Sequence, residues 1–143
     1  MNMDIMRTGL ETAAYSETVT IPATSSLTYV SGILADLSDI EVPPGTVSSY
    51  GDTKTQTLSV FNKINKILQA RNLSMADIIQ IRVFLVGTVE FDGKLDFSGF
   101  QQGYNMFFGS SDQPNKPTRT AVQVVALPLP GTLVEVDVIA VGR

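Results

Sequence analysis

The chain has 143 residues, of which 43% are hydrophobic and 17% charged, a balance typical of one globular domain rather than a disordered segment. Ten basic and 14 acidic residues give a net charge of −4, which argues against a nucleic-acid partner because such binding needs a basic face. Because cysteine and histidine are absent, thiol nucleophiles, disulfides, Ser-His-Asp triads and Cys/His zinc sites are excluded. Any chemistry must use Arg, Lys, Asp, Glu, Tyr, Ser, Thr, the backbone or water.

The sequence shows no sign of a membrane span, a leader or a second domain. No stretch reaches the about 18 apolar residues that a membrane-spanning helix needs. The first seven residues lack the apolar core of a secretory signal, so we expect a cytoplasmic protein. Without an internal repeat or a composition shift, residues 1–143 are expected to form a single domain.

The first predicted elements are two β-strands, at residues 18–21 and 27–33, separated by a polar turn. A loop follows over residues 36–50, with Pro43-Pro44-Gly45 at its centre. Its length makes it our candidate for a segment that closes over a binding cleft.

A long helix is predicted next, over residues 53–71, with Asp52 as its N-cap and Asn72 at its end. One side of this helix is an apolar stripe, formed by Leu58, Phe61, Ile64 and Leu68. Ser74 and Asp77 have the spacing of a capping box and precede a β-branched, apolar stretch. That stretch, Ile78–Val86, is predicted to be a strand.

A second helix is predicted over about residues 95–108, where aromatic side chains gather on one side. Gly99 and Gly103 each weaken it by about 1 kcal/mol, so packing must hold it. Two strands close the chain, at residues 119–127 and 133–141, and the short connection between them is a hairpin candidate. The order ββαβαββ predicts an α+β sheet with two helices on one face.

The last two long strands predict self-association. In the last strand, the side chains of Val134, Val136, Val138 and Ala140 face one way and those of Leu133, Ile139 and Val141 the other. The strand at residues 78–86 is also interpreted as apolar on both sides. Because two helices cover only one face of such a sheet, the other face needs a second copy of the chain to cover it.

Arg119 and two acids on the last strand are the first candidate functional residues. Glu135 and Asp137 lie in a mostly apolar strand, where a carboxylate is costly to bury without a partner or a task. Arg119 begins the preceding strand, and its guanidinium could hold a small carboxylate through two parallel hydrogen bonds. Spacing alone favours the alternative, a structural ion pair between Arg119 and one of these acids.

For the other polar residues, the sequence alone favours structural roles over functional ones. Ser31-Gly32 interrupts a strand, either to offer its hydroxyl and amides to a substrate oxygen or as a bulge. Taken alone, Tyr15 is a surface tyrosine, Tyr104 a core residue and Gln101 a solvent-exposed polar residue. No glycine-rich phosphate loop is present.

Four segments in order resemble the Rid/YjgF family of reactive imine and enamine deaminases. They are Tyr15-Ser16 ahead of the strand that ends in YVSG (29–32), GDTKTQ (51–56), residues 100–108, and KPTRTAVQVVALP (116–128) followed by LVEVDVIA (133–140). The resemblance extends from about residue 15 to residue 141. It shifts the expectation for Arg119 and Glu135 from structural to functional roles.

The resemblance implies a chorismate-mutase-like fold, a homotrimer with a central barrel, and three clefts between subunits. It implies hydrolysis of small 2-imino acids or enamines, such as 2-aminoacrylate or 2-iminobutanoate, to 2-oxo acids and ammonia, without cofactor or metal. Arg119 would bind the substrate carboxylate, while Glu135 and the carbonyl of Ala121 would position the attacking water. The remaining substrate-binding residues would be Tyr15, Ser31, Gly32, Gln101 and Tyr104, with Tyr104 contributed by a neighbouring subunit.

This sequence departs from the family pattern around the expected pocket. Ala13-Ala14 replaces Gly-Pro, and Ile33, Gln101 and Ala121 replace Gln, Asn and Cys. Because these changes lie around the pocket wall, a divergent subgroup with another small substrate, such as an aminoacrylate or aminomuconate relative, is an alternative. The competing hypotheses are a non-catalytic trimer that binds 2-oxo acids, and RNA cleavage, which the negative charge and missing imidazole disfavour.

Overall fold

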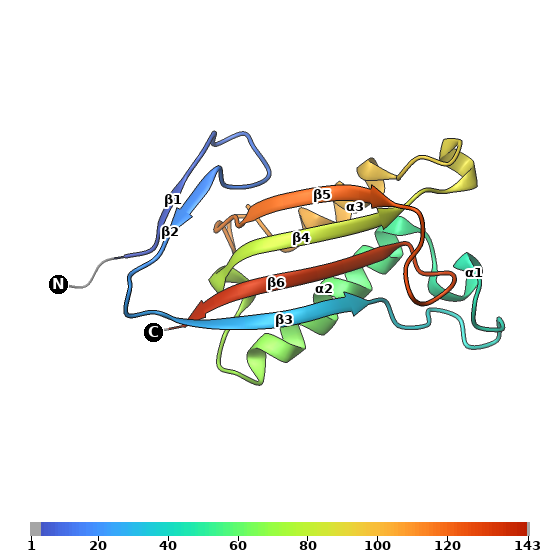
Figure 1. Ribbon diagram of the computed structural model, residues 1–143, viewed down its shortest axis with the longest axis horizontal. Helices are drawn as coiled ribbons and strands as arrows, with labels where there is room; N and C mark the ends of the chain where they lie inside the picture. The colour runs from blue at the N-terminus through green and yellow to red at the C-terminus, as the bar shows by residue number, and fades with distance from the viewer. Residues whose placement is uncertain (1–3, 143) are drawn as a thin grey trace.

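The computed structural model describes residues 4–142 and is built around a four-stranded mixed sheet with two helices packed on one face (Figure 1). The sheet has the order β3-β6-β4-β5, in which β6 is antiparallel to both neighbours and β5 is parallel to β4. These strands are β3 (Ser26–Leu34), β4 (Ile78–Val86), β5 (Thr118–Val124) and β6 (Val134–Gly142). The other elements are β1 (Met6–Thr8), β2 (Thr18–Thr20), α1 (Val47–Tyr50), α2 (Thr53–Gln69), η1 (Met75–Asp77), η2 (Val89–Phe91) and α3 (Phe97–Tyr104).

The expected caps of the long helix α2 are confirmed. The Asp52 carboxylate accepts a 2.8 Å hydrogen bond from the Thr55 amide, and past the end of the helix Asn72 adopts a left-handed φ of 59°. The Ser74–Asp77 capping box is also present, in η1 directly before β4. These local signals are strong because each depends on side chains and amides only a few residues apart.

The second helix is shorter than the sequence predicts, because α3 begins after Asp96 and ends at Tyr104 instead of covering residues 95–108. The Asp96 carboxylate caps its start by accepting a 2.9 Å hydrogen bond from the Gly99 amide. Gly103 lets α3 approach α2 closely, since a Cβ there would lie 2.7 Å from Cγ2 of Thr57. The glycine that weakens the isolated helix thus permits the packing that holds it.

The predicted hairpin between the last two strands is wrong, because β6 lies between β3 and β4, and β5 pairs with β4 instead. The helix-facing residues of β6 are all buried, which suits a strand with a neighbour on each side. Strand β5 contains exposed residues such as Thr120 and Val122, which is consistent with its position at the edge of the sheet. Strand β2 likewise pairs with β1, a strand that the sequence analysis missed, in a separate two-stranded sheet.

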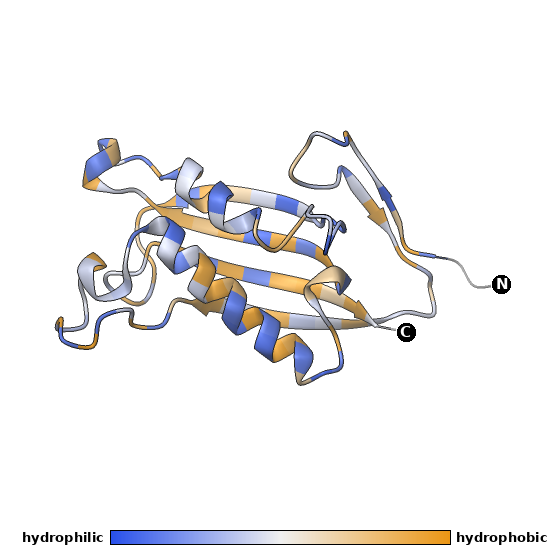
Figure 2. Cartoon of the chain, turned by 180° about the vertical axis from the view of Figure 1, so that it is seen from behind, coloured by the Kyte–Doolittle hydropathy of each residue, from blue (hydrophilic) through white to orange (hydrophobic). Residues whose placement is uncertain are grey.

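The two faces of the main sheet differ sharply. Figure 2 shows α2 and α3 on one face, where Ile81, Val83 and Leu85 of β4 are buried in the core. The opposite face is uncovered, and Tyr29 there is 70% exposed. The expectation that β4 is apolar on both sides is wrong in part, because its uncovered side carries Gln80 and Arg82 as well as Phe84. Within residues 4–142 no helix is long and apolar enough to cross a membrane.

Candidate functional site

Arg119 lies at the start of β5 and is surrounded by aromatic rings. Its Cζ lies 4.6 Å from the ring centroid of Tyr104, 5.1 Å from that of Tyr15, 5.6 Å from that of Phe97 and 5.7 Å from that of Phe100. Ring faces attract a cation, so they stabilise the guanidinium without neutralising it. Both phenylalanines belong to the aromatic stripe noted in the sequence, although the stripe alone did not assign them to Arg119.

Within residues 4–142, Arg119 forms no ion pair, and one hydrogen bond, from Nη1 to Oε1 of Gln101 at 2.9 Å, fixes its side chain. Burial lowers the pKa of Arg119 from its usual value, but an arginine stays protonated at physiological pH. The guanidinium fork therefore keeps donors for a planar anion. The structural ion-pair alternative fails, because Asp137 pairs with Arg82 at 2.7 Å.

Tyr104 and Gln101 shape this cation site in different ways. The expectation that Tyr104 comes from a neighbouring subunit is wrong, because it lies against Arg119 of its own chain. The Tyr104 side chain is fully buried, and its hydroxyl donates a 2.7 Å hydrogen bond to the carbonyl of Ala14. Burial raises the pKa of Tyr104 well above its usual value, so the phenol remains a neutral donor. Gln101 donates to Asn105 Oδ1 at 2.8 Å while it accepts from Arg119, and it therefore orients the guanidinium instead of lying free in solvent.

A second group of predicted residues lies at an irregularity in β3. The pairing between β3 and β6 shifts register between Val30 and Ile33, so Ser31 and Gly32 form the bulge that the sequence allowed as an alternative. A Cβ on Gly32 would lie 2.9 Å from Cδ of Glu135. The missing side chain thus lets the carboxylate lie directly against the strand backbone.

These two groups lie on opposite faces of the sheet within one chain. Arg119 pairs with Ile81 of β4, and Glu135 pairs with Phe84. Because side chains alternate along β4, Ile81 and Phe84 point to opposite faces. Arg119 and Ala121 therefore share the face of the helices, whereas Glu135 lies on the uncovered face. A single chain does not bring the two predicted catalytic residues together.

Each group borders a hollow of its own. On the uncovered face, Tyr29, Ser31, Gly32 and Arg82 line a hollow of about 520 Å³. On the other side of the sheet, a hollow of about 480 Å³ lies beside Gln101 and is also lined by Ala13, Ala14 and Lys116. Within the part of the chain that the structure describes, no three Asp or Glu residues gather as metal ligands would.

Similarity to known sequences and solved structures identifies the family of the chain. The family described as Endoribonuclease L-PSP matches residues 8–142, and related solved structures carry the names Rid and YjgF/YER057c/UK114. The chain belongs to this family. A Rid family protein from Yersinia pestis, of unknown function, has a similar fold, with a TM-score of 0.71 at 19% identity over 96% of this chain and 98% of that one.

One of the curated relatives carries the name of a deaminase. A RutC family protein of Pyrococcus horikoshii is 37% identical over 63% of this chain, and the match spans 63% of that relative's length. TdcF of Escherichia coli, provisionally named a reactive intermediate deaminase, is 32% identical over 81% of this chain and 79% of its own. A crystal structure of TdcF with bound serine covers 86% of this chain and 85% of that one, with a TM-score of 0.63 and 26% identity. The yeast protein MMF1, named as mitochondrial, is 29% identical over 92% of this chain and 77% of its own.

Proposed function

We propose that the protein hydrolyses small 2-imino acids or their enamine tautomers to 2-oxo acids and ammonia. The observation that carries this proposal is the half-buried guanidinium of Arg119, which is held by Gln101 and aromatic rings but has no acidic partner among residues 4–142. A cation kept in this state suits a ligand carboxylate. The serine bound to the relative TdcF is itself a small carboxylate-bearing molecule.

In the proposed reaction, Arg119 grips the substrate carboxylate and thereby fixes the imine carbon in space. That carbon is already electrophilic, so orientation and a placed water do most of the work. Water adds to the carbon while Glu135 accepts its proton, and the carbonyl of Ala121 holds the water. Glu135 then passes this proton to the nitrogen of the resulting carbinolamine. The C–N bond breaks, the hydroxyl loses its proton, and ammonia leaves as the 2-oxo acid forms. Base assistance of this kind contributes about 10²–10⁴-fold.

Because Arg119 and Glu135 lie on opposite faces of one sheet, the complete site needs two chains. The proposed assembly is a homotrimer in which the Arg119 edge of one chain meets the uncovered face of its neighbour. Tyr15 and Tyr104 then line the cleft from the first chain, and Ser31 and Gly32 from the second. The uncovered face, with exposed Tyr29, supports such a contact.

The test is ammonia release in a coupled assay, in which a dehydratase generates 2-aminoacrylate or 2-iminobutanoate in situ. We expect the wild-type chain to accelerate ammonia release above spontaneous hydrolysis. Arg119→Ala should abolish this gain, and Arg119→Lys should restore little of it because an ammonium lacks the planar fork. Arg71→Ala, which removes an exposed arginine after α2, is the matched control and should behave as wild type.

The alternative function is binding of 2-oxo acids without turnover, which the same cation site would support. Saturable binding of 2-oxobutanoate without any rate effect would identify that function and remove the deaminase proposal. An unchanged rate in Arg119→Ala would remove the carboxylate clamp. We propose a cytoplasmic location, which fractionation of the source cells would test.

A further inference from the structure

Lys116 is the centre of four hydrogen bonds that join distant parts of the chain. Its Nζ donates to the carbonyl oxygens of Glu11 and Ala13, both at 2.7 Å. Its own carbonyl oxygen accepts from Nη1 of Arg7 at 2.7 Å and from Oγ of Ser16 at 2.6 Å. We call these four bonds the Lys116 cluster. Lys116 is half-buried, so water does not easily replace the two carbonyl bonds of its ammonium.

The Lys116 cluster joins the segment that carries Tyr15 to the strand that carries Arg119. Arg119 follows Lys116 by three residues, and the amide of Ser16 donates to the carbonyl of Pro117 at 2.8 Å. Tyr15 itself is 43% exposed, so its own packing holds it only in part. Its ring reaches Arg119 because the residues before and after it are bonded to Lys116 and Pro117.

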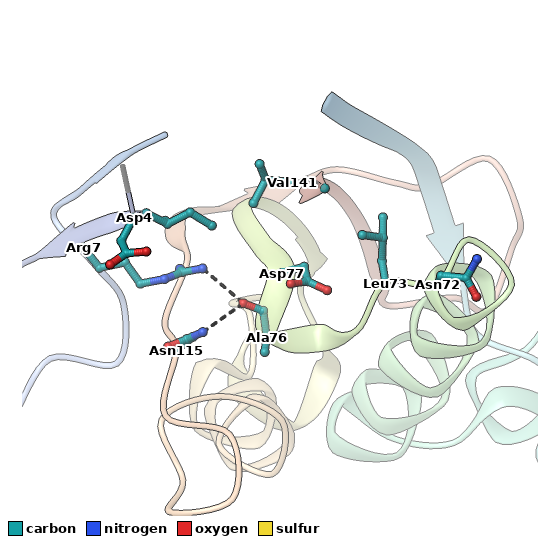
Figure 3. A pocket seen from close by; sticks show the side chains of 10 residues that line it. Asp4, Arg7, Asn72, Leu73, Ala76, Asp77, Asn115 and Val141 are labelled. Carbon is teal, nitrogen blue, oxygen red and sulfur yellow. Dashed lines mark hydrogen bonds between the residues drawn. The ribbon is translucent and has the colours of Figure 1, made fainter. Parts of the chain in front are cut away.

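Further hydrogen bonds join the residues of the Lys116 cluster to η1 and to the start of β4 in the main sheet. Asn115 Nδ2 and Arg7 Nη2 both donate to the carbonyl of Ala76, at 3.1 and 3.2 Å (Figure 3). Arg7 also donates to the carbonyl of Ile78, the first residue of β4. Lys116 is therefore fixed relative to the main sheet, and it transfers that fixed position to the Tyr15 segment through its ammonium.

From this geometry we infer that Lys116 is a positioning residue, which holds Tyr15 on the guanidinium of Arg119 and thereby sets the affinity for a substrate carboxylate. The functional half of this inference rests on the proposed deaminase activity, but the geometric half does not. A neutral side chain at this position leaves the carbonyls of Glu11 and Ala13 without a donor, and the segment between them and Ser16 loosens. Arg119 then loses one of its aromatic walls.

The geometric half is tested by NMR on Lys116→Met, which removes the ammonium but keeps a side chain of similar length. The Arg119 Nε–Hε signal, assigned by its loss in Arg119→Lys, is shifted by the surrounding rings. In Lys116→Met it should move toward its position in Tyr15→Leu, and the amides of residues 13–17 should exchange at least tenfold faster. Lys116→Arg should restore both, and Lys66→Met, an exposed lysine on α2, should change neither.

The functional half is tested by kinetics on the same variants. Arg119 grips the carboxylate equally in the ground and transition states, so Lys116→Met should raise KM about tenfold while kcat stays within twofold. An unchanged Arg119 signal and unchanged exchange would overturn the inference, and so would a shifted signal with an unchanged KM. If the wild type releases no ammonia, the proposed function fails, and the Arg119 signal and the affinity for 2-oxobutanoate decide the inference instead. If Lys116→Met does not fold, Lys116→Leu, which also lacks a donor, carries the same predictions.

Discussion

At the scale of single residues, different features of the structure fix the two candidate catalytic side chains. The charge of Arg119 is kept available by neutral neighbours, the rings of Tyr15 and Tyr104 and the amide of Gln101. The position of the Glu135 side chain depends instead on steric room, since only a glycine at position 32 leaves space for its carboxylate. The first arrangement suits the proposed binding of a carboxylate, and the second suits the proposed proton transfer.

Gly32→Ala should therefore impair catalysis without unfolding the protein. Gly32 does not have a positive φ, so its backbone accepts alanine, but the new Cβ would lie 2.9 Å from Cδ of Glu135 and must push the carboxylate away. We expect kcat to fall about tenfold or more, because small misplacements at a reacting centre are costly. Thermal denaturation should show a melting temperature near that of wild type.

A double-mutant cycle shows whether Gly32→Ala acts through Glu135. Glu135→Gln alone should lower kcat by about 10²–10⁴-fold, because the amide cannot accept the proton of water. Adding Gly32→Ala to Glu135→Gln should lower kcat no further if the two changes remove the same function. Additive losses would mean that the glycine serves another purpose.

At the scale of helices and strands, the sequence predicts what is decided locally. The Asp52 cap, the Asn72 end and the Ser74–Asp77 box depend on neighbouring residues, and all three are present. The hairpin prediction was wrong because alternation along a strand decides which face is buried but not which strand lies beside it. The segment between β5 and β6 passes across the end of β4 instead of turning back, and no local signal marks that path.

Asp52→Ala should lower the free energy of unfolding by about 1 kcal/mol at pH 7, the usual cost of losing an N-cap. Hydrogen bonds from Thr55 hold the pKa of Asp52 below its usual value, so the folded state favours the charged carboxylate. The stabilisation is therefore complete above the unfolded pKa and is lost as the pH falls through the folded one. Urea titrations should show the difference from wild type shrinking below about pH 4.

The control for this prediction is Asp112→Ala, which removes an exposed carboxylate in a loop and should leave stability almost unchanged at every pH. A loss in Asp52→Ala that persisted undiminished in strong acid would contradict a charge-dependent cap. It would show instead that the protonated carboxyl still accepts the hydrogen bond of the Thr55 amide.

At the scale of the whole molecule, the sequence nominates residues for the candidate site and, through the resemblance, a cleft between subunits, but it does not reveal which face of the sheet each residue occupies. The resemblance to the Rid family nominates Arg119, Glu135 and their neighbours, and the family itself is confirmed. Their placement on opposite faces follows from the register of β4 with both β5 and β6, which no single segment encodes. Long-range pairing therefore decides that the sheet separates Arg119 from Glu135 within one chain.

Mixing two inactive variants tests this division directly. Arg119→Ala and Glu135→Gln should each lose activity alone, because every cleft lacks one of the two groups. In the proposed trimer, a mixture would form some clefts that combine Arg119 from one chain with Glu135 from its neighbour, so activity should return. With equal amounts of freely exchanging chains, about one cleft in four is complete, and activity should approach a quarter of the wild-type value. Because the two residues of one chain lie on opposite faces of its sheet, a mixture no more active than its separate parts would mean that the reaction does not use both residues together.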